Sequence, residues 1–423
     1  MKISGIICEY NPLHNGHLHH IRAVRANGAD AIVAVMSGNF MQRGDVSIME
    51  KLTRAQLALK AGVDLVIELP VIWSLSPADQ FAAGGVALLD ALRVVDEISF
   101  GCECADLGLL QTAAEVCRTC QTEYADTLRH FTRQGNSYPA VLQELVTQIA
   151  GEEVAAVLSE PNNTLAISYL NALTDQSSRI RPFAVQRRGA GHNSTGAAPI
   201  SEPICTETDL SEVKSIASAS YIRYCLDENI DCRHMVPAAS YRAINEAMKN
   251  GTFASMRNLE RILLYTLRTF PPEYLPEIAE VGSQGLANRI YQARTATSLD
   301  DLWNRLRTKR YPTARLRRIL LHMLIGVTKN DIYTLPPYGR ILAFNNTGRT
   351  VLALSKGIRT LPFAESLKWL SAQSDAALHC AMLESKATDI YQLACNSIGT
   401  AGSDFRHKIM LTDTDTELQD CEE

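Results

Sequence analysis

Residues 3–17 read ISGIICEYNPLHNGH, and this stretch decides the fold. Residues 3–8 are a short apolar run typical of a buried strand, and residues 16–27 carry helical spacing. Pro12 lies between them and favours a loop, because proline fixes its own backbone angle and has no N–H to donate. The stretch therefore predicts a first strand that runs into a first helix through a loop ending at His14-Asn15-Gly16-His17.

The same alternation of short apolar strands and helices continues along the chain. Further buried strands are predicted at residues 31–36, 65–69 and 97–100, and helices at residues 49–61 and 78–92. Strands that alternate with helices favour a parallel sheet with crossover helices. The predicted fold class is α/β, with a Rossmann-like parallel sheet and a mostly helical C-terminal domain.

Two domains are predicted, with a boundary within residues 231–237. The first domain, residues 1–230, holds the whole parallel sheet and the nucleotide site. A fragment ending near Asp231 is expected to bind ATP alone if it is soluble, and to aggregate if the boundary buries apolar surface. The second domain, residues 231–423, is mostly helical, and its last twelve residues carry six acidic side chains and look like a frayed tail. Smaller features are a helical insertion at about 107–158, a strand at 182–185, a helix at 218–226 and a strand-rich piece at 340–354.

Composition and charge are those of an ordinary globular protein. The 423 residues are 46% hydrophobic with a formal net charge of −5, so a polyanion would have to bind a local basic patch. No apolar run approaches the roughly 20 residues of a membrane helix, and the start of the chain lacks a signal-peptide pattern. We expect a cytoplasmic protein with no membrane partner; the oligomeric state is not predicted.

Eleven cysteines in such a chain are expected to be reduced thiols. Cys102, Cys104, Cys117 and Cys120 have a paired spacing that could hold zinc. Cys117 and Cys120, however, lie in a helical-looking stretch without the turn that a zinc knuckle needs. We therefore expect no zinc and no other metal bound by protein ligands.

The residues His14-Asn15-Gly16-His17 carry the chemistry of a phosphate site. A helix N-terminus presents unpaired N–H groups and the positive end of the helix dipole. Gly16 lets a nucleotide approach the backbone, and His14 and His17 share one helix face. Adenylyl transfer needs mainly positioning and charge stabilisation, which suits this arrangement. The alternative is that the two are ordinary surface or capping histidines.

The His-x-Gly-His string after a first strand resembles the motif of the nucleotidyltransferase superfamily. Over almost the whole chain the sequence also resembles the bacterial tRNA(Met) cytidine acetate ligases, in residues 9–17, 36–44, 62–70, 161–163 and 217–223. That resemblance implies a two-step reaction with ATP, in which acetate forms an acetyl-adenylate and pyrophosphate. The N4 amine of the wobble cytidine of elongator tRNA(Met) then takes the acetyl group and AMP leaves. Mg²⁺ is expected to accompany ATP.

The resemblance also implies the residues of the site, with His14 and His17 as the catalytic pair. Of the paired asparagines and arginines, one of each is expected to be structural, and the sequence leaves open which. Gly191-His192-Asn193 departs from a family Gly-Tyr-His arrangement. The implied ATP-binding residues are Ile7, Cys8, Glu9, Tyr10, Asn11, Pro12, Leu13, His14, Asn15, Gly16, His17, Leu18, His19, His20, Gly101, Asn162, Asn163, Arg187 and Arg188.

Two further segments are candidates from their own residues. Ser218 and Ser220 open a predicted helix and could bind the β- and γ-phosphates or serve only as caps. Arg43 lies in a loop after the second strand, where it could meet phosphate or tRNA or simply be solvated. His19 and His20, although within the implied ATP segment, are expected from their own residues to form a solvated face.

The strongest polyanion footprint lies in residues 305–318, where seven of fourteen residues are basic and none is acidic. Tyr311 adds a ring that could stack on a base. The alternative is a solvated helix face paired with acidic neighbours. Two other functions stay open: a small-molecule adenylyltransferase, and a non-catalytic nucleotide- or RNA-binding protein. The predicted tRNA-binding residues are Arg305, Arg307, Lys309, Arg310, Arg315, Arg317 and Arg318.

Overall fold

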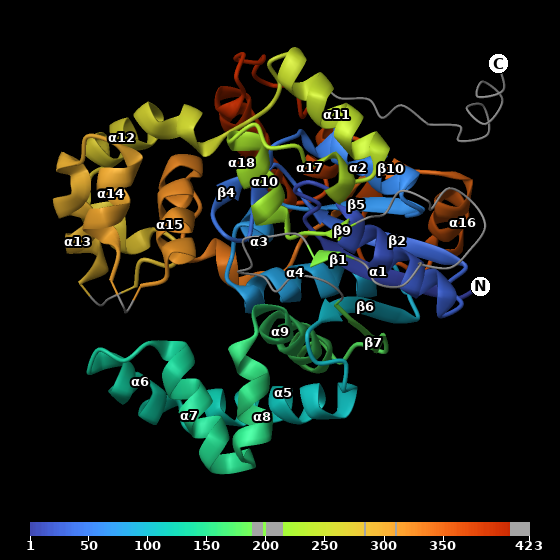
Figure 1. Ribbon diagram of the computed structural model, residues 1–423, viewed down its shortest axis with the longest axis horizontal. Coiled ribbons are helices and arrows are strands. Elements are labelled where there is room, and N and C mark those ends of the chain that lie inside the picture. The colour runs from blue at the N-terminus through green and yellow to red at the C-terminus, as the bar shows by residue number, and fades with distance from the viewer. Residues whose placement is uncertain (188–197, 200–214, 283–284, 309–310, 407–423) are drawn as a thin grey trace.

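The predicted apolar runs form the central sheet of the computed structural model, which describes residues 1–187, 198–199, 215–282, 285–308 and 311–406. In that part of the chain a seven-stranded sheet has the order β11-β10-β5-β2-β1-β6-β7 (Figure 1). The five strands from β5 to β7 in this order are parallel. The α/β class is therefore confirmed. Their bounds are β1 Ile3–Cys8, β2 Ala31–Ser37, β5 Leu65–Leu69, β6 Glu97–Cys102 and β7 Arg181–Gln186.

Helices cover both faces of the sheet, which explains why its central strands are continuous apolar runs. Helix α4 packs directly on β1, since a Cβ on Gly85 would lie 2.5 Å from the Ile7 side chain. Strands β3 and β4 form a small antiparallel hairpin after β2. The elements of this region are α1 Asn15–Ala26, β3 Phe40–Met41, β4 Asp45–Val46, α2 Lys51–Lys60, α3 Val71–Ser74, α4 Ala78–Ala91, α9 Pro161–Asp175, β8 Ala198–Pro199, β9 Ser215–Ile216 and α10 Ala219–Asp227.

The predicted insertion is helical, and it forms the group of helices at the lower edge of Figure 1. Cys117 and Cys120 are buried in its first helix, where burial raises the pKa of the Cys117 thiol to about 12. Among the described residues, no group of three or more histidine, cysteine or acidic side chains could hold a metal ion. The helices are α5 Leu107–Thr122, α6 Ala125–Arg133, α7 Tyr138–Ala150 and α8 Glu152–Ala156.

The C-terminal half is mostly helical, as predicted. Across the described ranges, no helix combines the length and the apolar character needed to cross a membrane. The predicted acidic tail lies outside the described residues. The helices are α11 Ala238–Lys249, α12 Glu260–Thr269, α13 Leu286–Gln292, α14 Leu299–Leu306, α15 Thr313–Ile325, α16 Asn346–Ser355, α17 Leu367–Ser371 and α18 Asp375–Ala394.

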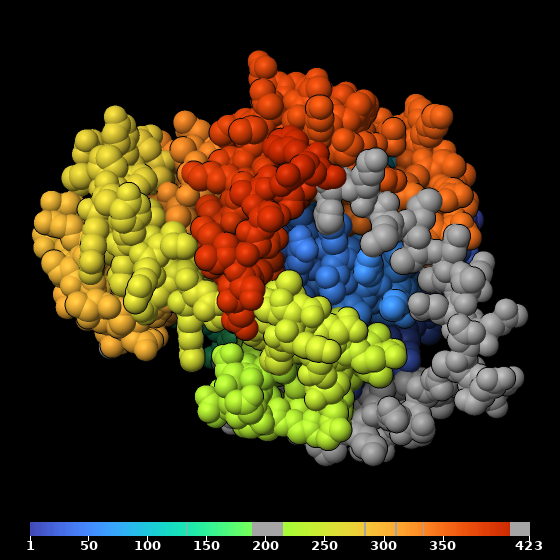
Figure 2. Space-filling view, turned by 90° about the horizontal axis from the view of Figure 1, so that it is seen from above, coloured from blue at the N-terminus to red at the C-terminus, as the bar shows by residue number. Residues whose placement is uncertain are grey.

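The sheet extends past the predicted domain boundary, although the five parallel strands lie before residue 231 as predicted. Strands β10 (Gly339–Phe344) and β11 (Phe363–Ala364) complete one edge, and β10 runs antiparallel to β5. Only the first part of the strand-rich piece expected at 340–354 is a strand, because Asn345 caps helix α16 immediately after it. The space-filling view shows C-terminal residues (red) between the helices α12 to α14 (yellow) and the N-terminal residues (blue) (Figure 2).

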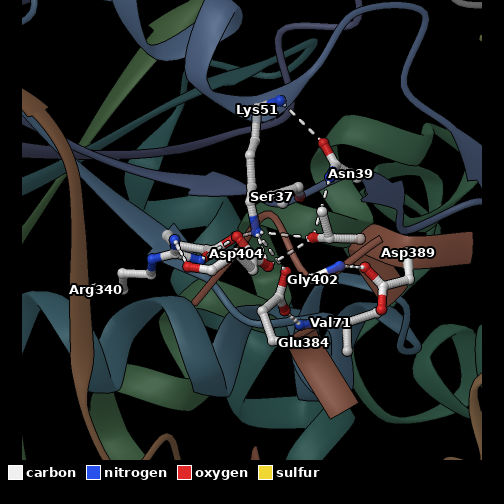
Figure 3. A network of polar contacts seen from close by, with 12 residues as sticks. Ser37, Asn39, Lys51, Val71, Arg340, Glu384, Asp389, Gly402 and Asp404 are labelled. Carbon is white, nitrogen blue, oxygen red and sulfur yellow. Dashed lines mark hydrogen bonds and ion pairs between the residues drawn. The ribbon is translucent and has the colours of Figure 1, made fainter. Parts of the chain in front are cut away.

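A buried ionic network fastens this C-terminal segment to the sheet (Figure 3). The Lys51 ammonium lies 2.6 Å from Glu68, 3.1 Å from Glu384 and 2.8 Å from Asp404. The Arg340 guanidinium lies 3.2 Å from Glu68 and 2.7 Å from Asp404. All five side chains are at most 2% exposed. Two cations and three carboxylates therefore join α2, β5, β10, α18 and the chain beyond it.

Candidate active site

A cavity of about 560 Å³ opens at the carboxyl end of β1 and the N-terminus of α1. Other walls come from the ends of β6 and β7 and from the starts of α9 and α10. The hairpin residues Gln42 and Arg43 and the α15 residues Ala314 and Arg318 close it. Crevices at the carboxyl ends of parallel strands are where open α/β sheets bind ligands. This cavity is therefore the candidate nucleotide site.

His14 and His17 are oriented by the start of helix α1. The Gly16 N–H donates to Nδ1 of His14 (3.1 Å), and the His14 N–H donates to Nδ1 of His17 (3.3 Å). A neutral imidazole that accepts at Nδ1 carries its proton on Nε2. The two rings stack with centroids 3.7 Å apart. The two histidines thus cap the helix through Nδ1, and their Nε2–H groups remain as neighbouring donors for a ligand in the cavity.

Both imidazoles are neutral near pH 7. Burial lowers the pKa of His14 to about 3, with smaller contributions from Arg187 and Arg223, and burial likewise lowers the pKa of His17. Neutral rings can sit side by side at a helix start without repulsion. A phosphate placed against them would favour their protonated forms.

The structure divides the implied ATP segment into lining residues and supporting residues. Asn15 donates to the carbonyls of Ser215 and His234, and Asn11 accepts the Ile48 N–H. These two asparagines therefore tie the loop to neighbouring segments. Asn11, Pro12, Leu13, Asn15 and Leu18 do not line the cavity. The lining residues are Ile7, Cys8, Glu9, Tyr10, His14, Gly16, His17, His19 and His20.

The prediction that His20 lies on a solvated face is wrong. Its Nε2 pairs with the Ser99 hydroxyl at 2.8 Å, and its ring lines the cavity. Burial lowers the pKa of His20 to about 4. Arg43 lines the cavity as well, where its hairpin packs on α15, and its side chain is exposed as the solvated-loop alternative predicts.

The structure separates the two asparagines that the sequence left open. Asn162 lines the cavity, and its Oδ1 accepts from the Arg187 guanidinium at 3.3 Å. Asn163 is buried, and its Oδ1 accepts the backbone N–H groups of Glu103 and Cys104 at 2.9 Å. Gly101 and Arg187 line the cavity too.

The start of helix α10 forms another part of the wall. Ser218 caps the helix by accepting the Tyr221 N–H at 3.2 Å, and both Ser218 and Ser220 line the cavity. The capping role is confirmed, whereas phosphate binding stays a prediction. Arg188 and the stretch Gly191-His192-Asn193 lie outside the described residues.

Of three charged residues at the site, Glu9 belongs to the implied ATP segment, whereas Arg54 and Arg223 were not predicted as site residues. Glu9 accepts the Gln42 N–H at 2.6 Å, and Arg223 donates to the Asn11 carbonyl at 2.7 Å. Arg54 is fully buried and donates to the backbone carbonyls of Glu9 and Met49 at 2.6 and 3.1 Å, and to those of Ser37 and Gly38. Because these contacts join distant segments, only the folded chain reveals them.

The basic stretch does not form one exposed face. Arg318 is buried in an ion pair with Glu280 (2.6 Å) and lines the candidate nucleotide cavity. Arg315 donates to the Glu280 carbonyl, and Arg305 pairs with Asp301 at 2.7 Å. Tyr311 is 6% exposed, so the expectation that its ring stacks on a base is wrong.

Two arginines of the basic stretch remain accessible to a bound RNA. Arg307 is exposed, and Arg317 lines a second cavity. Lys309 and Arg310 lie outside the described residues.

A His-x-Gly-His helix start that follows the first strand of a parallel sheet defines a nucleotidyltransferase of the HIGH class. In agreement, the family HIGH Nucleotidyl Transferase matches residues 1–404. The chain belongs, within that class, to the family of tRNA(Met) cytidine acetate ligases.

Relatives of that name are similar over nearly the full length. The protein of Caldanaerobacter subterraneus subsp. tengcongensis is 36% identical over 97% of this chain and 100% of its own. That of a Thermoanaerobacter species is 37% identical over the same shares. The crystal structure of Thermotoga maritima TmcAL bound with α-thio ATP has a TM-score of 0.86 and 28% identity, and covers 97% of this chain and 99% of its own. The apo form has a TM-score of 0.87.

Proposed function

We propose that this chain activates acetate with ATP and transfers the acetyl group to N4 of the wobble cytidine of elongator tRNA(Met). In the first step an acetate oxygen bonds to the α-phosphorus, and the bond to pyrophosphate breaks. In the second, the cytidine N4 bonds to the acetyl carbon, the carbonyl–phosphate bond breaks, and AMP leaves with release of a proton. The product is N4-acetylcytidine.

The observation that carries the proposal is the paired Nε2–H donors of His14 and His17 at a helix N-terminus. Donors fixed in advance stabilise the charge that develops on the α-phosphate oxygens, because they need not reorient during the reaction. Arg187, held by Asn162, supplies a cation on the neighbouring wall. The names of the relatives and the α-thio ATP bound to the T. maritima protein support the same substrates.

Mg²⁺ belongs to the proposal because ATP usually reacts as its magnesium complex. Glu9 is the single acidic side chain in the lining among the described residues. Mg²⁺ commonly takes one or two carboxylates together with phosphate oxygens and water. An ion held mainly by the phosphates would fit this lining, and Glu9 would be the carboxylate available to it.

The test is the stoichiometry of the full reaction. Purified protein with ATP, labelled acetate and elongator tRNA(Met) should give equal amounts of AMP, pyrophosphate and acetylated RNA, with N4-acetylcytidine identified by mass spectrometry. A stable adenylylated product in place of AMP would favour a small-molecule adenylyltransferase. No pyrophosphate release with acetate would favour a non-catalytic binding protein.

A further inference from the structure

A second cavity, of about 700 Å³, shares a wall with the candidate nucleotide cavity. In the β3–β4 hairpin, Gln42 and Arg43 line the nucleotide cavity, whereas Asp45 and Val46 line the second. Arg223 lines both. Helix α15 is divided in the same way, with Arg318 on one side and Arg317 on the other. One hairpin, one helix and one arginine therefore separate the two spaces.

The shared wall is close-packed. Gly44 at the hairpin turn has φ of +73°, and a Cβ there would lie 2.5 Å from Cβ of Arg317 and 2.6 Å from the Arg318 nitrogen. The turn thus rests directly on the α15 backbone. A group held in the second cavity would have a fixed position relative to one in the nucleotide cavity.

The lining of the second cavity combines an aromatic ring with charges of both signs. Trp303 is half-buried, and the Arg317 guanidinium lies 5.7 Å from the centre of its ring. Arg257 is exposed at the same cavity, and so are the carboxylates Asp227 and Asp300. Aromatic rings and guanidinium planes stack on unpaired bases, arginines bind phosphates, and carboxylates accept from exocyclic amines. This mixture fits a nucleotide better than a fatty or purely anionic ligand.

We propose that the second cavity binds one nucleotide of the acceptor RNA, adjacent in the strand to the cytidine that reacts. This rests on the proposed function. The reacting N4 must reach the nucleotide cavity, so the base behind the hairpin is a flanking one. Its base stacks on Trp303 while Arg317 and Arg257 take its phosphate. The cavity then sets the register of the RNA strand on the enzyme.

The first experiment separates RNA positioning from acetate activation. Trp303→Leu should raise KM for an anticodon stem-loop by about tenfold, from the loss of one base–aromatic stack. Acetate-dependent ATP–pyrophosphate exchange without RNA should be unchanged. Trp303→Phe should restore most of the affinity, and Trp369→Leu, at an exposed tryptophan of α17, should have no effect. Arg317→Ala should lower the salt dependence of RNA binding by about one counterion.

The second experiment couples the cavity to one nucleotide. Stem-loops with an abasic site 5′ or 3′ of the reactive cytidine are tested on the wild type and on Trp303→Leu. At one of the two positions the abasic loss and the Trp303→Leu loss should not add, because both remove the same contact. Full additivity at both positions, or a normal KM in Trp303→Leu, would overturn the proposal. If the wild type activates acetate but acetylates no RNA, the proposed function fails, and the same cycle measured as RNA binding still decides the nucleotide site.

Discussion

His14 and His17 divide their two ring nitrogens between structure and chemistry. In each ring Nδ1 accepts a backbone N–H at the start of α1, so Nε2 is the donor that remains for a ligand. A histidine that caps a helix is therefore not an alternative to a phosphate-binding histidine here. The same residue does both.

Removing either Nε2–H donor should slow acetyl-adenylate formation. In His14→Asn and His17→Asn the amide oxygen can still accept the backbone N–H that Nδ1 accepts in the wild type. The shorter side chain, however, no longer places an N–H donor where Nε2 was. Each change should reduce the rate by about 10² or more, as for loss of one donor to a developing oxyanion. Acetate-dependent pyrophosphate release measures the step, and His130→Asn on the distant helix α6 is the control. Near-normal release in either variant would contradict the phosphate role.

The lowered histidine pKa values predict how stability depends on pH. The unfolded His14 titrates near 6.5 and the folded one near 3, so between these values the unfolded state binds more protons. The free energy of unfolding that neutral, buried His14 contributes is fully present above pH 6.5 and is lost as the pH falls. At pH 5 it should cost about 2 kcal/mol. Urea unfolding at pH 7 and pH 5 measures it, and His14→Asn should lose less stability than the wild type. An equal loss in both would contradict a neutral, buried His14.

Helix α2 stabilises the loops of the nucleotide cavity through the side chain of Arg54. Arg54 is 0% exposed, and its guanidinium binds the backbone at the carboxyl ends of β1 and β2. Burial lowers the pKa of Arg54 to about 10. The element thus sets the shape of the loops that line the nucleotide cavity without lining it.

Replacing Arg54 should damage the site through its backbone. Arg54→Met leaves several buried carbonyls without donors, which costs about 1–3 kcal/mol for each one left unsatisfied. Arg54→Lys restores some of these bonds and should recover part of the stability. In both variants KM for ATP should rise more than kcat falls. Lys60→Met, at the exposed end of the same helix, is the control, and an unchanged KM for ATP in folded Arg54→Met would refute the positioning role.

At the scale of the whole molecule, the C-terminal segment contributes to both the central sheet and the nucleotide cavity. A fragment ending near Asp231 would lack β10, Arg318 of the nucleotide cavity and three members of the buried network. Lys51 and Glu68 would lose Arg340, Glu384 and Asp404. Of the two outcomes that the sequence left open, aggregation is therefore the one expected for such a fragment, and ATP binding by a soluble fragment would contradict it.

The network itself predicts unequal effects for its carboxylates. Burial and the neighbouring Glu68 raise the pKa of Glu384 to about 8, so this group is mostly protonated near neutral pH. Asp404, whose pKa Lys51 and Arg340 hold low, is ionised. Asp404→Asn should therefore cost about 3–5 kcal/mol, and Glu384→Gln much less. Glu277→Gln, in an exposed pair with Lys329, is the control.

The pH dependence of the same pair of variants is a further check. The raised pKa of Glu384 gives stability that is present below about pH 4.5 and is lost as the pH rises through about 8. The stability of the wild type relative to Glu384→Gln should therefore fall between pH 6 and pH 9. Urea titrations over this range measure it. A difference that rises with pH would mean that Glu384 is ionised.

Local patterns in the sequence determined the five parallel strands, the first helix and the His-x-Gly-His start, because strand and helix periodicity are carried by neighbouring residues. The tertiary structure alone decided which side chains meet. It placed β10 beside β5, brought Arg318 from the basic stretch into the nucleotide cavity, and assigned Asn162 rather than Asn163 to the lining. The physical reason is that antiparallel pairing at a sheet edge, buried ion pairs and cavity walls join residues far apart in the chain. Their strength depends on burial and geometry, which no local spacing encodes.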